Sequence, residues 1–385
     1  MKIHVCLVSD QILANLIPAL MERPDRVVLV ASAEMKRREQ DQRLAQALSG
    51  YGIATDSVDD APDVSLIAIR RYAEALRDAL SESASSATVT LNATGGTKLM
   101  MLGFVEAFRH GAIRTIYADT AHRRIEEIGG KEIGMENVLD VPSYLAAQGI
   151  RIDRIDSDDE SRRDAIDKRA ELTRFIGTNI VTLQAGIKIL NGILAKAIEK
   201  DPSTRQERLA RPDFELQKGA WGDFEKLLVR GNALGLLEWQ KGGKSGHFAN
   251  LESARYFSGI WLEEYAWLCA GDNSLFDARM GVHRAGLGDE EINEFDLLVA
   301  HANQLLYVEC KTANYQWQIG KANQDAYKID SLSRLTRGLF GATWLLSAIE
   351  PPQELLDRVR ELRIRVLGPQ EIPNLGSHIA QWMKC

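Results

Sequence analysis

In the first 150 residues, hydrophobic runs typical of β-strands alternate with segments that have the hydrophobic spacing of amphipathic helices. This alternation predicts a layered α/β domain. Short runs rich in β-branched residues recur, and amphipathic segments with helical spacing separate them. The predicted strands are 3–9, 27–32, 53–58, 88–94 and 113–119, and the predicted helices are 11–22, 34–48, 64–80 and 97–109, of which 34–48 is expected to be exposed. This order predicts a parallel sheet with helices on both faces. A hairpin at 122–128 and 138–141, turning near Gly129 and Gly130, is expected to follow.

The pattern changes after residue 150. Residues 151–169 hold six basic and seven acidic side chains, which predicts a solvated linker or a salt-bridged helix at a domain boundary. Residues 171–250 are predicted to be mostly helical, and 223–249 have the outline of a winged helix: a helix, a short strand and a tight turn. Because residues 201–250 carry eight basic and seven acidic side chains, we expect this segment to be a structural spacer and not a DNA-binding element.

A second α/β unit is predicted from residue 255 onward. Its expected helices are 256–270, 320–337 and 352–361, and its expected strands are 294–300, 305–312, 341–348 and 364–368. The predicted division is therefore 1–150, 151–250 and 251–385. A chain of 385 residues exceeds one ordinary hydrophobic core, which agrees with several domains.

Composition narrows the classes of protein that fit. The chain is 45% hydrophobic and 26% charged, no apolar run approaches the ~20 residues of a membrane span, and the start is unlike a signal peptide. Four scattered cysteines without a CxxC pair favour a reducing cytoplasm and argue against a zinc ribbon or a disulfide framework. A formal net charge of −7 argues against a protein that coats duplex nucleic acid, so nucleic-acid contact should be local and brief.

Two charged residues share one face of an otherwise apolar strand, "LLYVECKTAN" at 305–314. Glu309 and Lys311 are two positions apart, and a turn at 301–304 would place Asp296 opposite Glu309, about 5 Å away. Carboxylates that close repel each other unless a cation lies between them. A surface ion pair between Glu309 and Lys311 is the alternative, but an opposed Asp predicts a Mg²⁺ or Mn²⁺ site that activates water against a phosphodiester, with Lys311 stabilising the developing charge.

This motif, D296-x12-E309-C-K311 on a hairpin, resembles the PD-(D/E)xK restriction-endonuclease-like superfamily. The proline that often precedes the Asp is absent. The resemblance implies a further glutamate on the preceding helix, where Glu263 is favoured and Glu264 is kept open. It implies Glu263, Asp296, Glu309 and Lys311 as catalytic residues and the three carboxylates as metal ligands. Lys321, Gln324 and Lys328 share a face of the helix expected after the site, where they would contact phosphate or solvent.

A glycine-rich loop follows the strand predicted at 88–94. The sequence "NATGGTK" would present backbone N–H groups at a helix N-terminus, which is a ready anion site, although it is not a Walker A loop and could be a simple turn. A second loop, 9–11, follows the first strand at the same sheet edge, where ligands of open α/β sheets bind. The predicted ligand-binding residues are Ser9, Asp10, Gln11, Thr94, Gly95, Gly96, Thr97 and Lys98.

Both loops, the order of elements and the downstream nuclease motif together resemble the CARF (CRISPR-associated Rossmann fold) family. The resemblance implies a sensor of cyclic oligoadenylate, in particular cyclic tetra-adenylate, that activates cleavage of single-stranded RNA, DNA or both in type III CRISPR defence. Because such a ring carries two-fold symmetry, we expect a homodimer that binds one ring. A CARF-type transcription regulator with a degenerate nuclease fold is the alternative. Whether the sensor also degrades its ring stays open.

Overall fold

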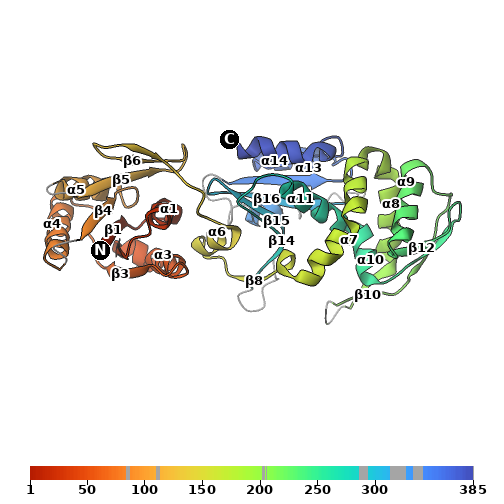
Figure 1. The fold of residues 1–385 in the computed structure, drawn as a ribbon, viewed down its shortest axis with the longest axis horizontal. Coiled ribbons are helices and arrows are strands. Elements are labelled where there is room, and N and C mark those ends of the chain that lie inside the picture. The colour runs from red at the N-terminus through yellow and green to blue at the C-terminus, as the bar shows by residue number, and fades with distance from the viewer. Residues whose placement is uncertain are drawn as a thin grey trace. The chain divides into compact units, whose positions relative to one another are not determined.

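We describe the protein from a computed structural model. The described residues are 1–83, 87–109, 113–201, 204, 206–285, 294–312, 327–332 and 341–384. The chain forms two compact units, one of Met1–Arg151 with His301–Gln304 and the other of Ile152–Ala300 with Leu305–Cys385 (Figure 1).

The first unit is built on a seven-stranded sheet with the order β3-β2-β1-β4-β5-β6-β7. Strands β1 to β5 are parallel, and β6 and β7 continue the sheet antiparallel. The strand order reverses between β1 and β4, which makes the space beyond their carboxyl ends the topological switch point where such sheets bind ligands. The strands are β1 Lys2–Leu7, β2 Arg26–Val30, β3 Ala54–Val58, β4 Thr88–Asn92, β5 Arg114–Asp119, β6 Arg124–Glu127 and β7 Glu132–Gly134.

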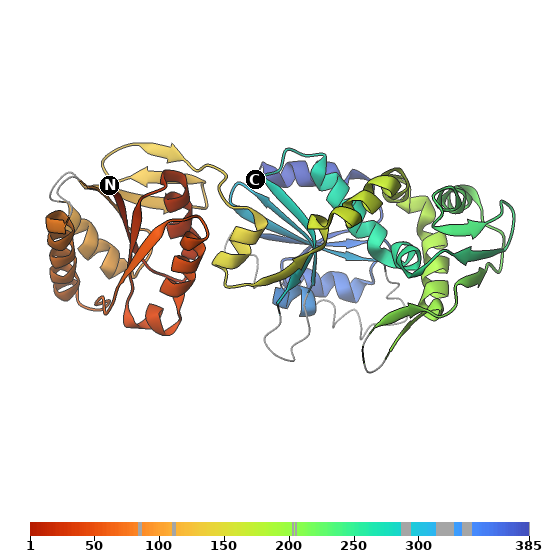
Figure 2. The same ribbon diagram turned by 60° about the horizontal axis from the view of Figure 1, so that its bottom comes forward.

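Helices cover both faces of this sheet, as the sequence predicted (Figure 2). Helices α4 and α5 pack together over one face, where Ile69 and Phe104 join a core with Val5 and Leu91. Helices α1, α3 and α6 pack against one another, and α1 and α3 contact the strands. The helices are α1 Ile12–Glu22, α2 Ala33–Arg37, α3 Gln40–Ser49, α4 Leu66–Ser83, α5 Lys98–Phe108 and α6 Val141–Ala147.

Two local predictions for this unit were wrong. The helix expected at 34–48 is divided into α2 and α3 at Glu39, whose backbone is left-handed (φ 56°), and α3 buries Leu44 and Leu48. The second strand of the hairpin is β7 and not 138–141. In that segment Asp140 is the N-cap of α6. Its side chain accepts the backbone N–H of Ser143, and a proline lies in the first helical turn.

The second unit is built on a six-stranded sheet with the order β18-β17-β16-β15-β14-β8. Strands β16, β17 and β18 are parallel, whereas β14 pairs antiparallel with both β15 and β8. The predicted turn between β15 and β16 is present, with Ala302 and Asn303 both left-handed, as in a two-residue hairpin turn. Strand β14 was not predicted, and β8 lies in the predicted linker. The strands are β8 Ile152–Ile155, β14 Asp277–Arg284, β15 Glu294–His301, β16 Gln304–Lys311, β17 Ala342–Ser347 and β18 Arg365–Leu367.

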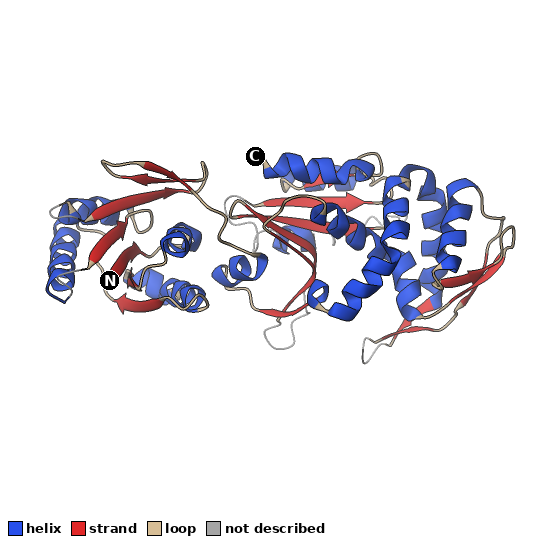
Figure 3. Cartoon of the chain, in the orientation of Figure 1, coloured by secondary structure: helices blue, strands red, loops and turns tan. Residues whose placement is uncertain are grey.

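Residues 152–250 belong to the same compact unit and the same hydrophobic core as this sheet. Figure 3 shows their helices and short strands. For residues 151–169 the sequence left a solvated linker and a salt-bridged helix open. The residues from Glu160 onward are helical and form the start of α7. The helix, strand and turn predicted within 223–249 are present as α9, β12 and the segment leading to β13, and a winged-helix relationship stays a prediction. The smaller strands are β9 Ile198–Lys200, β10 Glu207–Leu209, β11 Asp213–Glu215, β12 Leu237–Trp239 and β13 Ser245–Phe248.

The helices of this unit include one that is long and apolar enough to cross a membrane by length and composition. This is α8, with 18 residues and a mean hydropathy of 1.3, so the expectation that no segment reaches that measure was wrong. Its Leu183, Ile187 and Leu190 lie in the hydrophobic core. The helical elements are η1 Asp156–Asp158, α7 Glu160–Thr178, α8 Ile180–Ala197, α9 Gly222–Ala233, α10 Leu251–Arg255, η2 Tyr256–Ile260, α11 Trp261–Gly271, α13 Gln353–Glu361, η4 Ile372–Asn374 and α14 Leu375–Met383. Of the helix predicted at 320–337, residues 327–332 are described and helical.

Candidate active site and ligand-binding loops

The hairpin of β15 and β16 brings Asp296 together with the residues of the Glu-x-Lys motif. Asp296 Oδ2 accepts the backbone N–H of Cys310 at 2.7 Å, so its carboxylate lies against β16 between Glu309 and Lys311. Asp296 and Glu309 are both buried. The hairpin therefore buries two carboxylates whose charges act on each other.

Glu309 is held by partners from three directions. Lys311 Nζ donates to Oε1, the Tyr307 hydroxyl donates to Oε2, and Lys328 Nζ lies 4.0 Å from Oε1. Burial alone would raise the pKa of Glu309, but the two lysines and these hydrogen bonds lower it below its usual value. These contacts favour the ionised form of Glu309 and hold its carboxylate in one orientation. Of the basic face predicted after the site, Lys328 reaches it, and Lys321 and Gln324 lie outside the described residues.

Asp296 has the opposite electrostatic character. Burial and the nearby negative charge of Glu309 raise the pKa of Asp296 to about 7, and Lys311 and the Cys310 N–H only partly offset this effect. Its carboxylate is therefore a negative charge that the chain does not fully neutralise. Such a charge in a buried place favours either a proton or a cation.

The two glutamates of the preceding helix point to different surroundings. The pKa of Glu263 is raised well above its usual value by burial and by the charges of Asp296 and Glu294, which brings Glu263 into the same electrostatic cluster. Glu264 is fully buried and pairs with Arg169, whose Nη2 lies 2.6 Å from Oε1. Glu263 is therefore linked electrostatically to the hairpin carboxylates, whereas Glu264 has a structural partner. The catalytic role of Glu263 stays a prediction.

Other described contacts hold the end of strand β16 in place. Thr312 Oγ1 donates to the carbonyl of Ser258 at 2.6 Å, in the π-helical turn η2 that precedes α11. Asn191 Nδ2 on α8 donates to the carbonyl of Thr312 at 2.7 Å. These contacts fix the residues beside Lys311 against both helices. No sequence pattern indicates these contacts, because the partners are 54 and 121 positions apart.

The residues of this cluster fit a hard divalent cation. Glu263, Asp296 and Glu309 supply carboxylate oxygens, the donor type that Mg²⁺ and Mn²⁺ prefer, and two of the three have pKa values raised by burial and by mutual repulsion. A cation would remove that repulsion.

A second group of metal-binding side chains was missed by the sequence analysis. One ligand atom from each of Asp156, His283 and Glu294 lies within 4.8 Å of the others, and the group could hold a metal ion. Arginines already compensate this group, however. Arg154 donates to His283 Nε2 at 2.8 Å and to Asp156 at 2.9 Å, and Arg162 also pairs with Asp156. The sequence spacing of these residues carries no metal-site pattern, because η1, β14 and β15 bring them together only in the folded chain.

In the first unit, the glycine loop lies directly against the end of β1. A Cβ atom on Gly95 would lie 1.9 Å from the Leu7 carbonyl oxygen and 3.1 Å from Ser9 Oγ, so only glycine permits this approach. Gly96 has φ +69°, which also favours glycine. The two predicted ligand loops therefore meet at the switch point between β1 and β4.

Two of the other predicted ligand residues already have hydrogen-bond partners within the protein. Asp10 accepts Arg38 Nη1 at 2.5 Å and Gln40 Nε2 at 3.2 Å. Thr94 Oγ1 donates to Asn92 and accepts the N–H of Ala118, so its hydroxyl is used inside the fold.

The start of α5 faces solvent. Thr97 Oγ1 accepts the Met100 N–H at 3.2 Å and caps the helix. Lys98 is exposed beside it, and Gln11 donates its backbone N–H to Ser9 Oγ at 3.2 Å. This edge therefore offers backbone N–H groups and Lys98 as donors, close to Ser9.

Comparisons with solved structures agree with this arrangement. Protein VC1899 from Vibrio cholerae is 22% identical, with a TM-score of 0.82 over 100% of this chain and 98% of that chain. Can2 from Sulfobacillus thermosulfidooxidans, solved with cyclic tetra-adenylate, is 24% identical, with a TM-score of 0.73 over 100% of both chains. A type III CRISPR defence DNA nuclease activated by cyclic oligoadenylate is 19% identical, with a TM-score of 0.53 over 91% of this chain and 46% of that chain. A search of curated protein sequences found no match.

Family models match both ends of the chain. A model described as "Card1 CARF domain" matches residues 3–144, and one described as "Card1-like, endonuclease domain" matches residues 250–385. The second match identifies an endonuclease and sets aside the alternative of a transcription regulator. The chain belongs to the Card1 family and joins a CARF domain to a Card1-like endonuclease domain.

Proposed function

We propose that this protein is a metal-dependent nuclease that cleaves single-stranded RNA, DNA or both when cyclic tetra-adenylate binds its CARF domain, as part of type III CRISPR defence. The observation that carries the proposal is the cluster of the buried Asp296 and Glu309 with the partly buried Lys311 on one hairpin, in a chain that also has a CARF domain. The likeness to Can2 with its bound cyclic tetra-adenylate supports the choice of activator.

Asp296, Glu309 and Glu263 would hold Mg²⁺ or Mn²⁺ in the working enzyme. The ion would lower the pKa of a bound water and polarise the scissile phosphate. The Tyr307 hydroxyl keeps Glu309 in one orientation, and the Cys310 N–H does the same for Asp296. Lys311 supplies a positive charge next to the carboxylates, where it can stabilise the negative charge that develops on the phosphate oxygens.

For activator binding, the backbone N–H groups at the start of α5 and the Lys98 ammonium form the phosphate-binding side of the pocket. The symmetric ring would be shared by two chains in a homodimer. An apolar surface close to the glycine loop supports this assembly. Val64 and Ile67 before and within α4, and Leu99 and Leu102 on α5, are 82%, 61%, 39% and 52% exposed. Thr97 Oγ1 donates to the Asp63 carbonyl at 3.3 Å, which joins these two segments beside the loop.

The test is a cleavage assay on single-stranded RNA and DNA with Mn²⁺, with and without each cyclic oligoadenylate. We expect cleavage that depends on both the metal and cyclic tetra-adenylate, and that is lost in Asp296→Asn. Cleavage of equal rate in Asp296→Asn would refute the site. Cleavage that is independent of every ring would refute the sensor role and leave a constitutive nuclease.

A further inference from the structure

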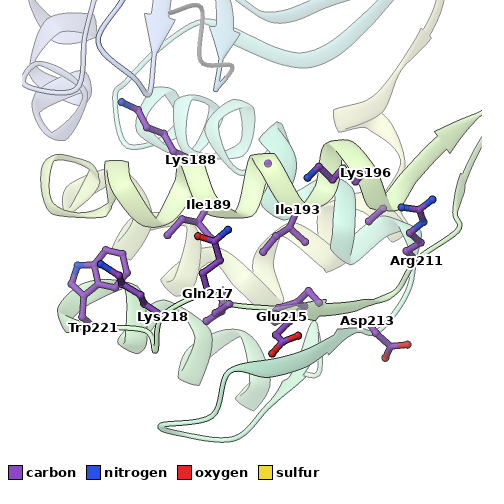
Figure 4. A pocket seen from close by; sticks show the side chains of 14 residues that line it. Lys188, Ile189, Ile193, Lys196, Arg211, Asp213, Glu215, Gln217, Lys218 and Trp221 are labelled. Atoms are coloured by element: carbon purple, nitrogen blue, oxygen red, sulfur yellow. The ribbon is translucent and has the colours of Figure 1, made fainter. Parts of the chain in front are cut away.

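Helix α8, strand β11 and the segment leading to α9 enclose a cavity of about 630 Å³, which we call the α8–β11 groove (Figure 4). It lies in the second unit, and none of its lining residues belongs to the hairpin site. The lining side chains that the following argument uses are Lys188, Ile189, Lys196, Arg211, Lys218 and Trp221.

The groove is positively charged, although the chain as a whole is acidic. Four basic side chains line it, and none of them has an ion-pair or hydrogen-bond partner through its side chain in the described part of the chain. Arg208, just outside the groove, is paired with Glu199 at 2.8 Å. Basic side chains without a partner, gathered around one hollow, favour a polyanion.

Two carboxylates also line the groove, and the strand geometry limits their effect. Strand β11 alternates its faces, so Phe214 and Leu216 enter the core while Asp213 and Glu215 are exposed. Figure 4 shows both carboxylates on the side of β11 away from α8. The wall formed by α8 therefore carries lysines without opposing acids.

An aromatic side chain stands at one end of the groove. Trp221 is 45% exposed, and its ring meets the buried Phe224 edge-on, with 5.4 Å between the ring centroids. Figure 4 shows Lys218 beside it, and Ile189, 37% exposed, lies on α8. An indole that is fixed at one edge and open to solvent beside cations is a platform on which an unpaired base can stack.

Helix α8 connects this groove with the end of strand β16. Asn191 binds the carbonyl of Thr312, the residue after Lys311. Lys188 lies three residues before Asn191, about 4.5 Å along the helix axis, and Lys196 lies eight residues beyond Lys188, about 12 Å further along. Basic side chains of α8 therefore lie both near the end of strand β16 and along the groove.

We propose that the α8–β11 groove binds the single-stranded nucleic acid substrate next to the cleavage site, with Trp221 stacking on a base and the four basic side chains contacting phosphates. This inference rests on the proposed nuclease function. A single strand is favoured over a duplex because stacking on Trp221 needs an unpaired base. Residues 201–250 were expected to be a structural spacer because their basic and acidic side chains are nearly balanced. That balance does not include Lys188 and Lys196, which line the same groove.

The test measures binding separately from cleavage. The full-length Glu309→Gln protein, with Mn²⁺ and cyclic tetra-adenylate, is titrated against fluorescein-labelled DNA and RNA strands of about 20 nucleotides, long enough to cover a typical single-strand site. Trp221→Ala should weaken binding about 5- to 150-fold, as expected for the loss of one stacked base, and Trp221→Phe should restore most of the affinity. Lys196→Ala/Arg211→Ala should weaken binding and reduce the slope of log affinity against log salt by about 1.4, which is the effect of two phosphate contacts.

The matched control is Lys226→Ala/Lys241→Ala, which removes the same charge from the same unit outside the groove lining. Thermal melting confirms that each variant is folded. Equal affinities and salt slopes for groove and control variants would overturn the proposal. So would an equal loss for a duplex and a single strand, or the absence of any strand binding. If the wild-type protein cleaves no nucleic acid while the groove variants still lose strand binding, the proposed function fails and the groove assignment stands.

Discussion

Exchanging Glu263 and Glu264 separately for glutamine should produce two different defects, because the fold gives these neighbours different surroundings. Glu264 faces Arg169, and their side chains are only 1% and 10% exposed. Arg169 donates to both oxygens of Glu264 and stacks over the Tyr256 ring, with its Cζ 4.8 Å from the centroid. Its other carboxylate partner, Glu252, is 64% exposed and compensates little of the charge.

Glu264→Gln therefore leaves a guanidinium buried without its main counter-charge. Breaking a buried ion pair on one side costs about 3–5 kcal/mol, so the free energy of unfolding should fall by that amount. Glu263→Gln acts in the opposite direction. The folded-state pKa of Glu263 is raised, mainly by burial, so its ionised form destabilises the metal-free fold as the pH rises above the unfolded-state pKa. A neutral amide should leave stability at pH 7.5 unchanged or higher, and should abolish cleavage.

Urea unfolding followed by tryptophan fluorescence measures this effect in the relevant unit, because all seven tryptophans lie between residues 221 and 382. A double-mutant cycle adds precision. Once Arg169→Met has removed the guanidinium, Glu264→Gln should cost far less than it does alone. A Glu264→Gln protein of normal stability without nuclease activity would reverse the assignment of the two glutamates. Equal destabilisation by both substitutions would refute the different surroundings of Glu263 and Glu264.

Four further outcomes follow from the same structure. Asp296→Asn and Glu309→Gln should each abolish cleavage and leave activator affinity unchanged in calorimetry, because they remove only metal-binding charge. Lys98→Ala should weaken activator binding, and Thr97→Ala should do so more than Thr97→Ser, which keeps the α5 cap worth about 1 kcal/mol; equal affinities would make the loop a simple turn. Gly95→Ala should destabilise the first unit by about 1–3 kcal/mol in thermal melting, because its methyl group would overlap a carbonyl of β1. Light scattering and calorimetry should find a homodimer that binds one ring per two chains; a monomer that binds one ring per chain would contradict the shared pocket.

Features that depend on residues close together in the sequence could be predicted from it. The alternation of period in the first 150 residues predicted the parallel sheet, because strand and helix patterns need only a few residues to appear. The turn at 301–304 was predicted from two apolar runs, and Ala302 and Asn303 adopt the left-handed conformation that such a turn requires. Strand β14, by contrast, includes Arg279, His283 and Arg284 and has no clean alternation, so its place beside β15 is decided by tertiary pairing.

Neighbouring residues alone do not decide which of Glu263 and Glu264 faces the hairpin. Adjacent residues on a helix point about 100° apart, so a shift in helix phase exchanges which one faces the hairpin. That phase is set by the π-helical turn η2 just before α11, and Thr312 binds this turn through the Ser258 carbonyl, 54 residues away. The partner that occupies Glu264 is Arg169, in the segment that a charge count identifies only as a possible linker. Because both determinants lie far away in sequence, a motif that ends at the hairpin cannot contain them. The identity of the third carboxylate is therefore a property of the packed helices, and the paired substitutions of Glu263 and Glu264 test that packing as directly as they test catalysis.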